Sequence, residues 1–62
     1  MRNAESYDLE KDGNVLTVLF YTKKKRAIVH IRQVGQDCEG AVEDLITGWI
    51  AGGWDVEVRR PA

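Results

Sequence analysis

This sequence contains few of the residues from which catalytic and metal sites are usually built. Its 62 residues include one cysteine, Cys38, and one histidine, His30. A single cysteine excludes a disulfide within the chain, and one cysteine with one histidine cannot form a zinc site of cysteine and histidine ligands. No glycine-rich phosphate loop or dinucleotide-binding motif is present. The sequence therefore predicts a protein that is not an enzyme and holds no metal or cofactor.

Long apolar segments are missing as well. No run approaches the roughly 18 apolar residues that a membrane-spanning helix needs, and the first eight residues show no signal-peptide core. A small chain without disulfides fits a reducing compartment. We therefore expect a cytoplasmic protein with no membrane partner, folded as a single small domain over residues 1–62.

Alternation of apolar and polar residues predicts strands in the first half of the chain. Asp12-Gly13 lies between two such segments and predicts a type I′ hairpin turn, which needs positive φ at both central residues. The segments 15–21 and 27–34 are rich in β-branched and aromatic residues, and a polar loop separates them. Residues 6–11 show a shorter alternation, and their pairing in the sheet stays an open question.

The period changes after Gly35. Apolar residues at spacings of three and four predict an amphipathic helix: Cys38, Ala41, Val42, Leu45, Ile46, Trp49 and Ile50. Asp37 is suited to cap its start, and Gly52 or Gly53 to end it. Residues 54–59 alternate again. The predicted fold is α+β, in the order ββ(β)αβ: an antiparallel sheet of three or four strands with one amphipathic helix packed on one face.

Two glycines, Gly40 and Gly48, lie within the predicted helix, and each costs about 1 kcal/mol relative to alanine. With Asp44 they form a row opposite the apolar stripe. This row is either a surface that a partner approaches closely or a weakness that a natural helix tolerates.

The net charge is −1, but the charges are segregated along the chain. Lys23, Lys24, Lys25 and Arg26 form a basic block at the expected tip of the second hairpin. Such a block is a possible nucleic-acid or anion contact; the alternative is a solvated loop that protects the sheet edge.

The strand at residues 15–21 is apolar on both faces, whereas one helix covers only one face of a sheet. Val15, Leu19 and Tyr21 would then form an apolar patch on the outer face. This predicts a possible homodimer through the outer sheet face; the alternative is that other side chains cover the patch.

The C-terminal part of the chain resembles the gene 2 protein family of T-odd coliphages, small phage-encoded inhibitors of bacterial RNA polymerase. The resemblance spans roughly the last 25 residues and is carried by the following positions: Glu39, Ala41, Val42, Glu43, Trp49, Gly53, Trp54, Asp55, Val56, Arg60 and Pro61. It implies a sheet with one helix and an arginine-bearing last strand that grips the polymerase. Arg60 matches one of the family's arginines, while Val58 and His30 replace a second arginine and a strand glutamate.

These observations favour a non-catalytic protein-binding module, an inhibitor from a phage or mobile element that docks on a host nucleic-acid machine such as bacterial RNA polymerase. Three alternatives remain: a nucleic-acid-binding protein that uses the Lys23–Arg26 tip, an inhibitor of a CRISPR-type defence nuclease, and a self-associating module. The expected partner-binding residues are Arg59, Arg60, His30, Arg32, Glu39, Glu43 and Asp44. Arginine suits this role because its planar fork pairs with carboxylates in two parallel bonds.

Overall fold

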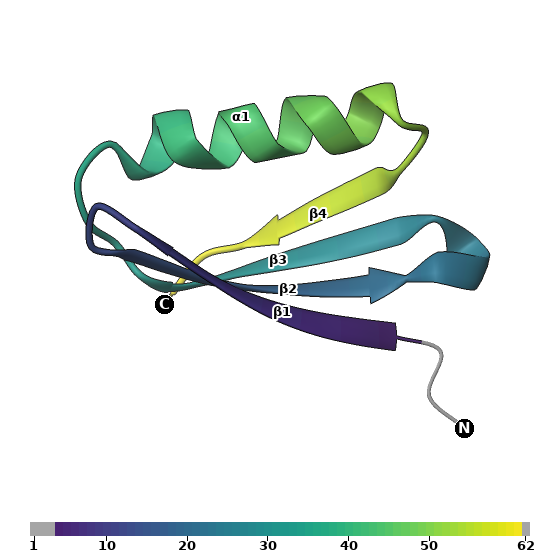
Figure 1. Ribbon diagram of the computed structural model, residues 1–62, viewed down its shortest axis with the longest axis horizontal. Helices are drawn as coiled ribbons and strands as arrows, with labels where there is room; N and C mark the ends of the chain where they lie inside the picture. Colours follow the sequence, from purple (N-terminus) through teal and green to yellow (C-terminus); the bar gives the residue numbers. More distant parts are fainter. Residues whose placement is uncertain (1–3, 62) are drawn as a thin grey trace.

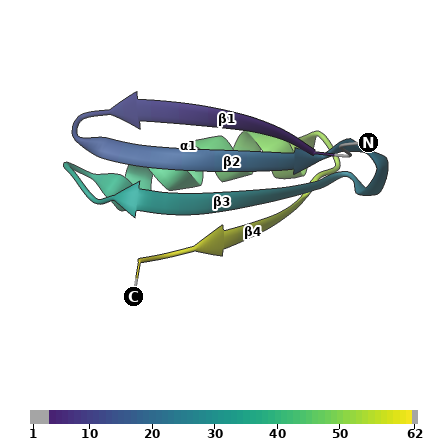
Figure 2. The same cartoon turned by 90° about the horizontal axis from the view of Figure 1, so that it is seen from below.

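The structure, a computed structural model, describes residues 4–61. Its elements, in chain order, are strands β1 (Ala4–Lys11) and β2 (Asn14–Tyr21), the 3-10 turn η1 (Thr22–Lys24), strand β3 (Arg26–Gln33), helix α1 (Cys38–Ala51) and strand β4 (Asp55–Arg59). The four strands form one sheet in the order β1-β2-β3-β4. Helix α1 lies across one face of this sheet, and the other face has no helix on it (Figure 1 and Figure 2).

The α+β class is confirmed, and the prediction of a wholly antiparallel sheet is wrong. β1, β2 and β3 pair antiparallel, but β4 pairs parallel to β3. The reason is the length of the connection. A helix of 14 residues spans about 21 Å and a strand of 8 residues about 26 Å. The helix therefore returns the chain to the end of the sheet where β3 begins, so β4 runs in the direction of β3 (Figure 1).

The first hairpin forms as its turn residues predict. Asp12 and Gly13 have φ of 52° and 81°, as a type I′ turn requires. β1 pairs with β2 along its whole length, from Ala4 opposite Tyr21 to Lys11 opposite Asn14. This answers the question left open for the first strand: it is part of the sheet, and it forms one edge.

Helix α1 begins and ends at residues suited to those positions. Asp37 accepts a hydrogen bond from the backbone N–H of Gly40 at 3.3 Å, which confirms it as the N-cap. A Cβ on Gly40 would lie 2.5 Å from the Asp37 carboxylate, so this glycine makes room for the cap. At the other end Gly53 has a φ of 89°, the left-handed conformation expected after a helix.

The core lies between α1 and the strands β2 and β3. Its buried members come from these three elements: Leu16, Val18, Val29, Ile31, Cys38 and Val42. Val18 and Val29 are paired across the two central strands and are almost fully buried. Burying a side chain of this size stabilises the fold by about 2 kcal/mol.

The buried amide of Asn14 joins the first hairpin to the segment that leads into α1. Its side chain donates to the carbonyl oxygens of Lys11 at 3.0 Å and Gln36 at 2.8 Å, and it accepts from the N–H of Gly35 at 2.6 Å. A Cβ on Gly35 would lie 2.4 Å from the carbonyl oxygen of Asp12. Only glycine allows the two segments to approach this closely.

We expect Asn14→Ala to lower the free energy of unfolding by on the order of 2 kcal/mol, because it removes three part-buried hydrogen bonds to the backbone of Lys11, Gly35 and Gln36. Gln33→Ala is the matched control. Its side chain donates to the carbonyl of Gly13 in the same turn, but from an exposed position. Urea denaturation measures both variants. Equal effects would contradict the importance of the buried amide.

The two helical glycines should respond differently to alanine. A Cβ on Gly48 meets no atom within 4 Å, so Gly48→Ala should raise the free energy of unfolding by about 1 kcal/mol through helix propensity. Gly40→Ala should lack this gain, because the new methyl group displaces the Asp37 carboxylate that caps the helix. Thermal unfolding of the two single variants measures the difference. Equal stabilisation by both substitutions would contradict this account of Gly40.

Candidate protein-binding surfaces

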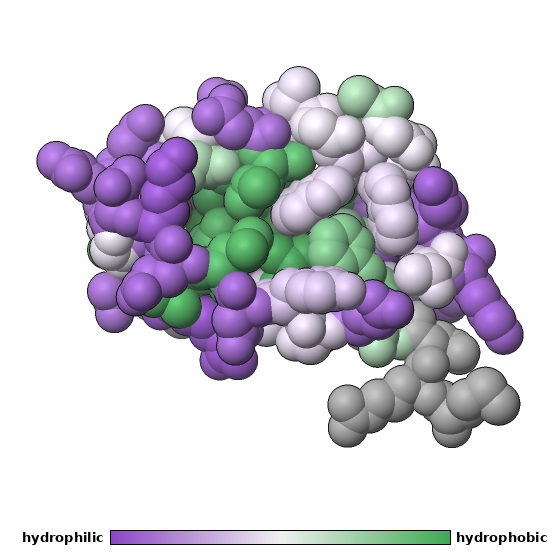
Figure 3. All heavy atoms as spheres, in the orientation of Figure 1, coloured by the Kyte–Doolittle hydropathy of each residue, from purple (hydrophilic) through white to green (hydrophobic). Residues whose placement is uncertain are grey.

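An apolar groove runs between α1 and the edge strand β1. It consists of two adjoining pockets of about 290 Å³ and about 470 Å³, and Leu9 and Leu45 line both of them. Figure 3 shows apolar side chains gathered between the helix and the edge strand, on the face that Figure 1 presents to the viewer. Tyr7 and Leu9 of β1 remain 50% and 39% exposed. The groove is therefore open to solvent along the β1 edge.

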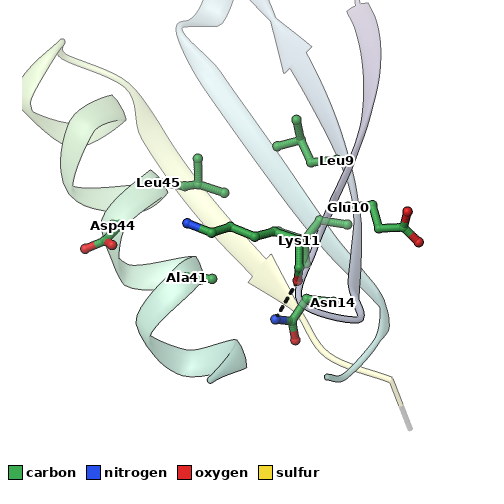
Figure 4. A pocket seen from close by; sticks show the side chains of 8 residues that line it. Leu9, Glu10, Lys11, Asn14, Ala41, Asp44 and Leu45 are labelled. Carbon is green, nitrogen blue, oxygen red and sulfur yellow. Dashed lines mark hydrogen bonds between the residues drawn. The ribbon is translucent and has the colours of Figure 1, made fainter. Parts of the chain in front are cut away.

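The close-up in Figure 4 shows how side chains enter the first pocket. Ala41 and Leu45 project from α1 towards β1, and Leu9 projects back towards them. Lys11 extends across the pocket towards the helix, whereas Glu10 points away from it. The floor is thus apolar; Lys11 reaches across it, and the carboxylates of Glu10 and Asp44 lie at its rims.

Aromatic rings form the other end of the groove. Phe20 stands edge-on to Tyr7, Trp49 and Trp54, with ring centroids 5.6, 5.3 and 5.3 Å apart. This arrangement is a favourable one for aromatic rings. The Tyr7 hydroxyl donates to Glu5 at 2.6 Å, and this hydrogen bond raises the pKa of Tyr7 above its ordinary value of 10.0. Tyrosine and tryptophan are enriched in protein interfaces.

The edge strand is acidic. Four carboxylates and one lysine lie on β1 and its turn: Glu5, Asp8, Glu10, Asp12 and Lys11. Asp44 lines the groove from the helix side. Of the acidic helix residues predicted to bind a partner, Asp44 is thus part of the groove, and Glu39 and Glu43 are exposed elsewhere on α1.

The structure separates the two C-terminal arginines. Arg60 forms an ion pair at 3.0 Å with Glu39 at the start of α1. Arg59 lies on the outer side of the sheet and pairs with Glu57, which also binds Arg26 at 2.6 Å. Each arginine stays about half exposed. The two arginines therefore do not form one paired charge at the end of the chain, because alternate strand residues point to opposite faces.

The outer sheet face holds the other two basic residues predicted to bind a partner. His30 pairs with Thr17 of β2 and with Arg59 of β4 in the sheet register. Arg32 donates to the Thr17 hydroxyl at 3.2 Å, and Thr17 donates to Asp8 at 2.9 Å. His30, Arg32 and Arg59 thus share one face.

Apolar side chains on this outer face are less exposed than expected for a sheet face that no helix covers. Val15, Leu19 and Tyr21 are each half-buried, and Ile28, which pairs with Leu19 and Glu57, is only 8% exposed. The homodimer through this face stays a prediction, one that the charged neighbours of the patch make less favourable.

The basic hairpin tip is partly engaged within the molecule. The Lys25 ammonium lies 4.9 Å from the ring centroid of Trp54, a cation–π contact, and Arg26 binds Glu57. Lys23 and Lys24 are exposed in η1. Nucleic-acid binding by this tip stays a prediction that now depends mainly on these two lysines.

Within residues 4–61, no group of three metal-ligating side chains comes together. Cys38 is buried in the core as a free thiol. No helix in the described part of the chain is long and apolar enough to cross a membrane.

The groove was not predicted from the sequence. Leu9 and Leu45 each fit an ordinary amphipathic pattern, and nothing in the spacing shows that α1 leaves β1 uncovered. The available signal was the surplus of apolar residues: the strand at residues 15–21 is apolar on both faces, and the first strand adds Tyr7 and Leu9.

Glu57 makes the stability of the sheet depend on pH. Hydrogen bonds from Arg59 and then Arg26 hold its pKa below the ordinary value of 4.5. A lowered pKa stabilises the fold above about pH 4.5, and this contribution is lost as the pH falls through the folded-state pKa.

We expect Glu57→Gln to be less stable than the wild type at about pH 7, with the difference shrinking towards about pH 2. Chemical denaturation across this range measures it, with Asp55→Asn, which lies exposed on the same strand, as the control.

Comparison of the chain with protein-family models, with curated proteins and with solved structures finds no match.

Proposed function

We propose that this protein is a non-catalytic protein-binding module that docks through the groove between β1 and α1. The supporting observation is an apolar groove whose side chains stay open to solvent and whose rims carry carboxylates. Exposed apolar surface bordered by polar residues is typical of a protein-interaction site. Tyr7 and Trp49 are of the residue types that often carry most of the binding energy in protein interfaces, and Leu9 and Leu45 add apolar surface beside them.

The charge of the groove favours a partner with a basic surface. Glu5 and Asp44 line it, with Glu10 and Asp8 on the adjoining outer side of β1 and Lys11 as the opposing charge. Complementary charge increases the rate of encounter and disfavours wrong partners. Surfaces that bind nucleic acid are basic, so an acidic module that covers such a surface would compete with DNA or RNA.

The target we propose is a host nucleic-acid machine, with bacterial RNA polymerase as the first candidate and a CRISPR-type nuclease as the second. The resemblance of residues 39–61 to the phage inhibitors supports the polymerase. The acidic groove is compatible with either target. On this proposal Arg59 and Arg60 act mainly within the molecule, where their ion pairs with Glu57 and Glu39 hold the end of β4 in place.

The test is binding to immobilised protein from a nuclease-treated bacterial lysate, followed by binding of purified RNA polymerase. We expect the wild type to retain a nucleic-acid-handling complex, and Leu9→Ser/Asp44→Lys to lose it because the floor and rim of the groove are both changed. Mass spectrometry identifies the retained proteins.

Two control variants reverse the charge at sites outside the groove. Lys23→Glu/Lys24→Glu alters the hairpin tip and should still bind. Arg59→Glu/Arg60→Glu alters the end of β4, and circular dichroism shows whether its fold is kept. If a folded arginine variant loses the complex while the groove variant keeps it, the binding site lies on β4 and the groove proposal is wrong.

A further inference from the structure

The outer edge of β1 presents backbone groups that have no partner strand. Within residues 4–61, β1 is the first strand of the sheet and pairs with β2 alone. In a two-residue hairpin the residues that flank the turn, here Lys11 and Asn14, exchange backbone hydrogen bonds, and the pattern alternates from there. Ser6, Asp8 and Glu10 therefore direct their N–H and C=O groups away from the sheet.

The protection that this edge carries is the charge of its side chains. Natural edge strands are protected by short length, bulges, proline or charged side chains, lysine above all. β1 is eight residues long and pairs with β2 in one unbroken register; it contains no proline and one lysine. The opposite edge, β4, has five residues, and the ion pairs of Glu57 hold its side chains. Of the two edges, β1 is the better template for strand addition.

The side chains of β1 specify what an added strand should look like. Tyr7 and Leu9 lie on the helix side and line the groove, whereas Asp8 and Glu10 lie on the outer side. In a strand added beside β1, alternate residues would lie next to the helix-side pair, Tyr7 and Leu9, and the residues between them would lie next to the outer pair of carboxylates. Its residues on the helix side should be apolar to fill the groove, and its outer residues should be basic to face the two carboxylates.

The same charges disfavour a second copy of this chain as the occupant. Two β1 strands would bring together two sets of three carboxylates with one lysine each. Like charges placed close across a strand pair are destabilising. A basic segment of a different protein has no such penalty.

We propose that the groove is completed by an extended segment of the partner protein, which pairs with β1 as a fifth strand and alternates apolar with basic residues. This proposal rests on the docking function above and specifies how the partner binds. Backbone hydrogen bonds at Ser6, Asp8 and Glu10 supply affinity, and the groove and the two carboxylates supply selectivity. This mode of recognition is known as β-strand addition.

The test uses the whole protein and a blocked peptide of sequence KVRLKVR, with KKRRVVL as a control peptide of the same composition. We expect KVRLKVR to bind more tightly than the control and to slow hydrogen exchange at the N–H groups of Ser6, Asp8 and Glu10. Nuclear magnetic resonance reports both results residue by residue. Equal affinity for the two peptides, or no new protection on β1, would overturn strand addition.

Two variants separate backbone pairing from charge. Ser6→Pro removes an outward N–H at a position where an edge strand tolerates proline, and it should weaken peptide binding about tenfold, the equivalent of one hydrogen bond. Asp8→Lys/Glu10→Lys should abolish the preference for KVRLKVR, whereas Glu43→Lys/Asp55→Lys, with the same change in net charge, should retain it. Thermal unfolding confirms that each variant is folded.

The same variants distinguish this proposal from the docking function on which it rests. If the partner complex is lost by Leu9→Ser/Asp44→Lys but kept by a folded Ser6→Pro variant, the groove is used and strand addition is wrong. If the wild type retains no partner, the docking function fails while peptide binding still tests the edge strand directly.

Discussion

The geometry of this fold depends on one buried amide. Asn14 is 2% exposed, and its three hydrogen bonds fasten the first hairpin turn to Gly35 and Gln36, just before the helix begins. The backbone of Gln36 adds a bond to Asp12 at 2.9 Å. A buried polar group of this kind is stable only when all its partners are in place. These contacts therefore fix the point from which α1 crosses the sheet, and with it the spacing between α1 and β1.

The groove follows from the widths of the two layers. Four strands spaced about 4.8 Å apart are wider than one helix of about 10 Å. The apolar stripe of α1 packs on β2, β3 and β4, through Val18, Val29 and Val58 among others. The edge strand β1 is then left with Tyr7 and Leu9 facing a space that the helix does not fill. A second helix or a fifth strand would cover it, and this chain supplies neither within residues 4–61.

Local signals in the sequence predicted the elements well, and the arrangement between them less well. Asp12-Gly13 specified the first turn, Asp37 the helix start and the pair Gly52-Gly53 its end, because each depends on backbone conformations within a few residues. The direction of β4 depends on how far the helix carries the chain, which the spacing of apolar residues does not show. The role of Asn14 depends on contacts with residues 35 and 36. One clue was available: Asn14 shares a strand face with Leu16 and Val18, so a polar residue was due to be buried there.

The candidate site was predicted only in part, because it too depends on contacts between residues that are far apart in the sequence. Sequence indicates which residues are charged but not which charges neutralise each other. Arg59, Arg60 and Arg26 suggested free cations, and all three have carboxylate partners supplied by Glu57 and Glu39 from elsewhere in the fold. The carboxylates at Asp8 and Glu10, by contrast, belong to an edge with unpaired backbone. Electrostatic repulsion between copies protects that edge from self-pairing in the free protein. On the strand-addition proposal the same charges attract a basic strand, so one feature would both limit self-pairing and favour the partner.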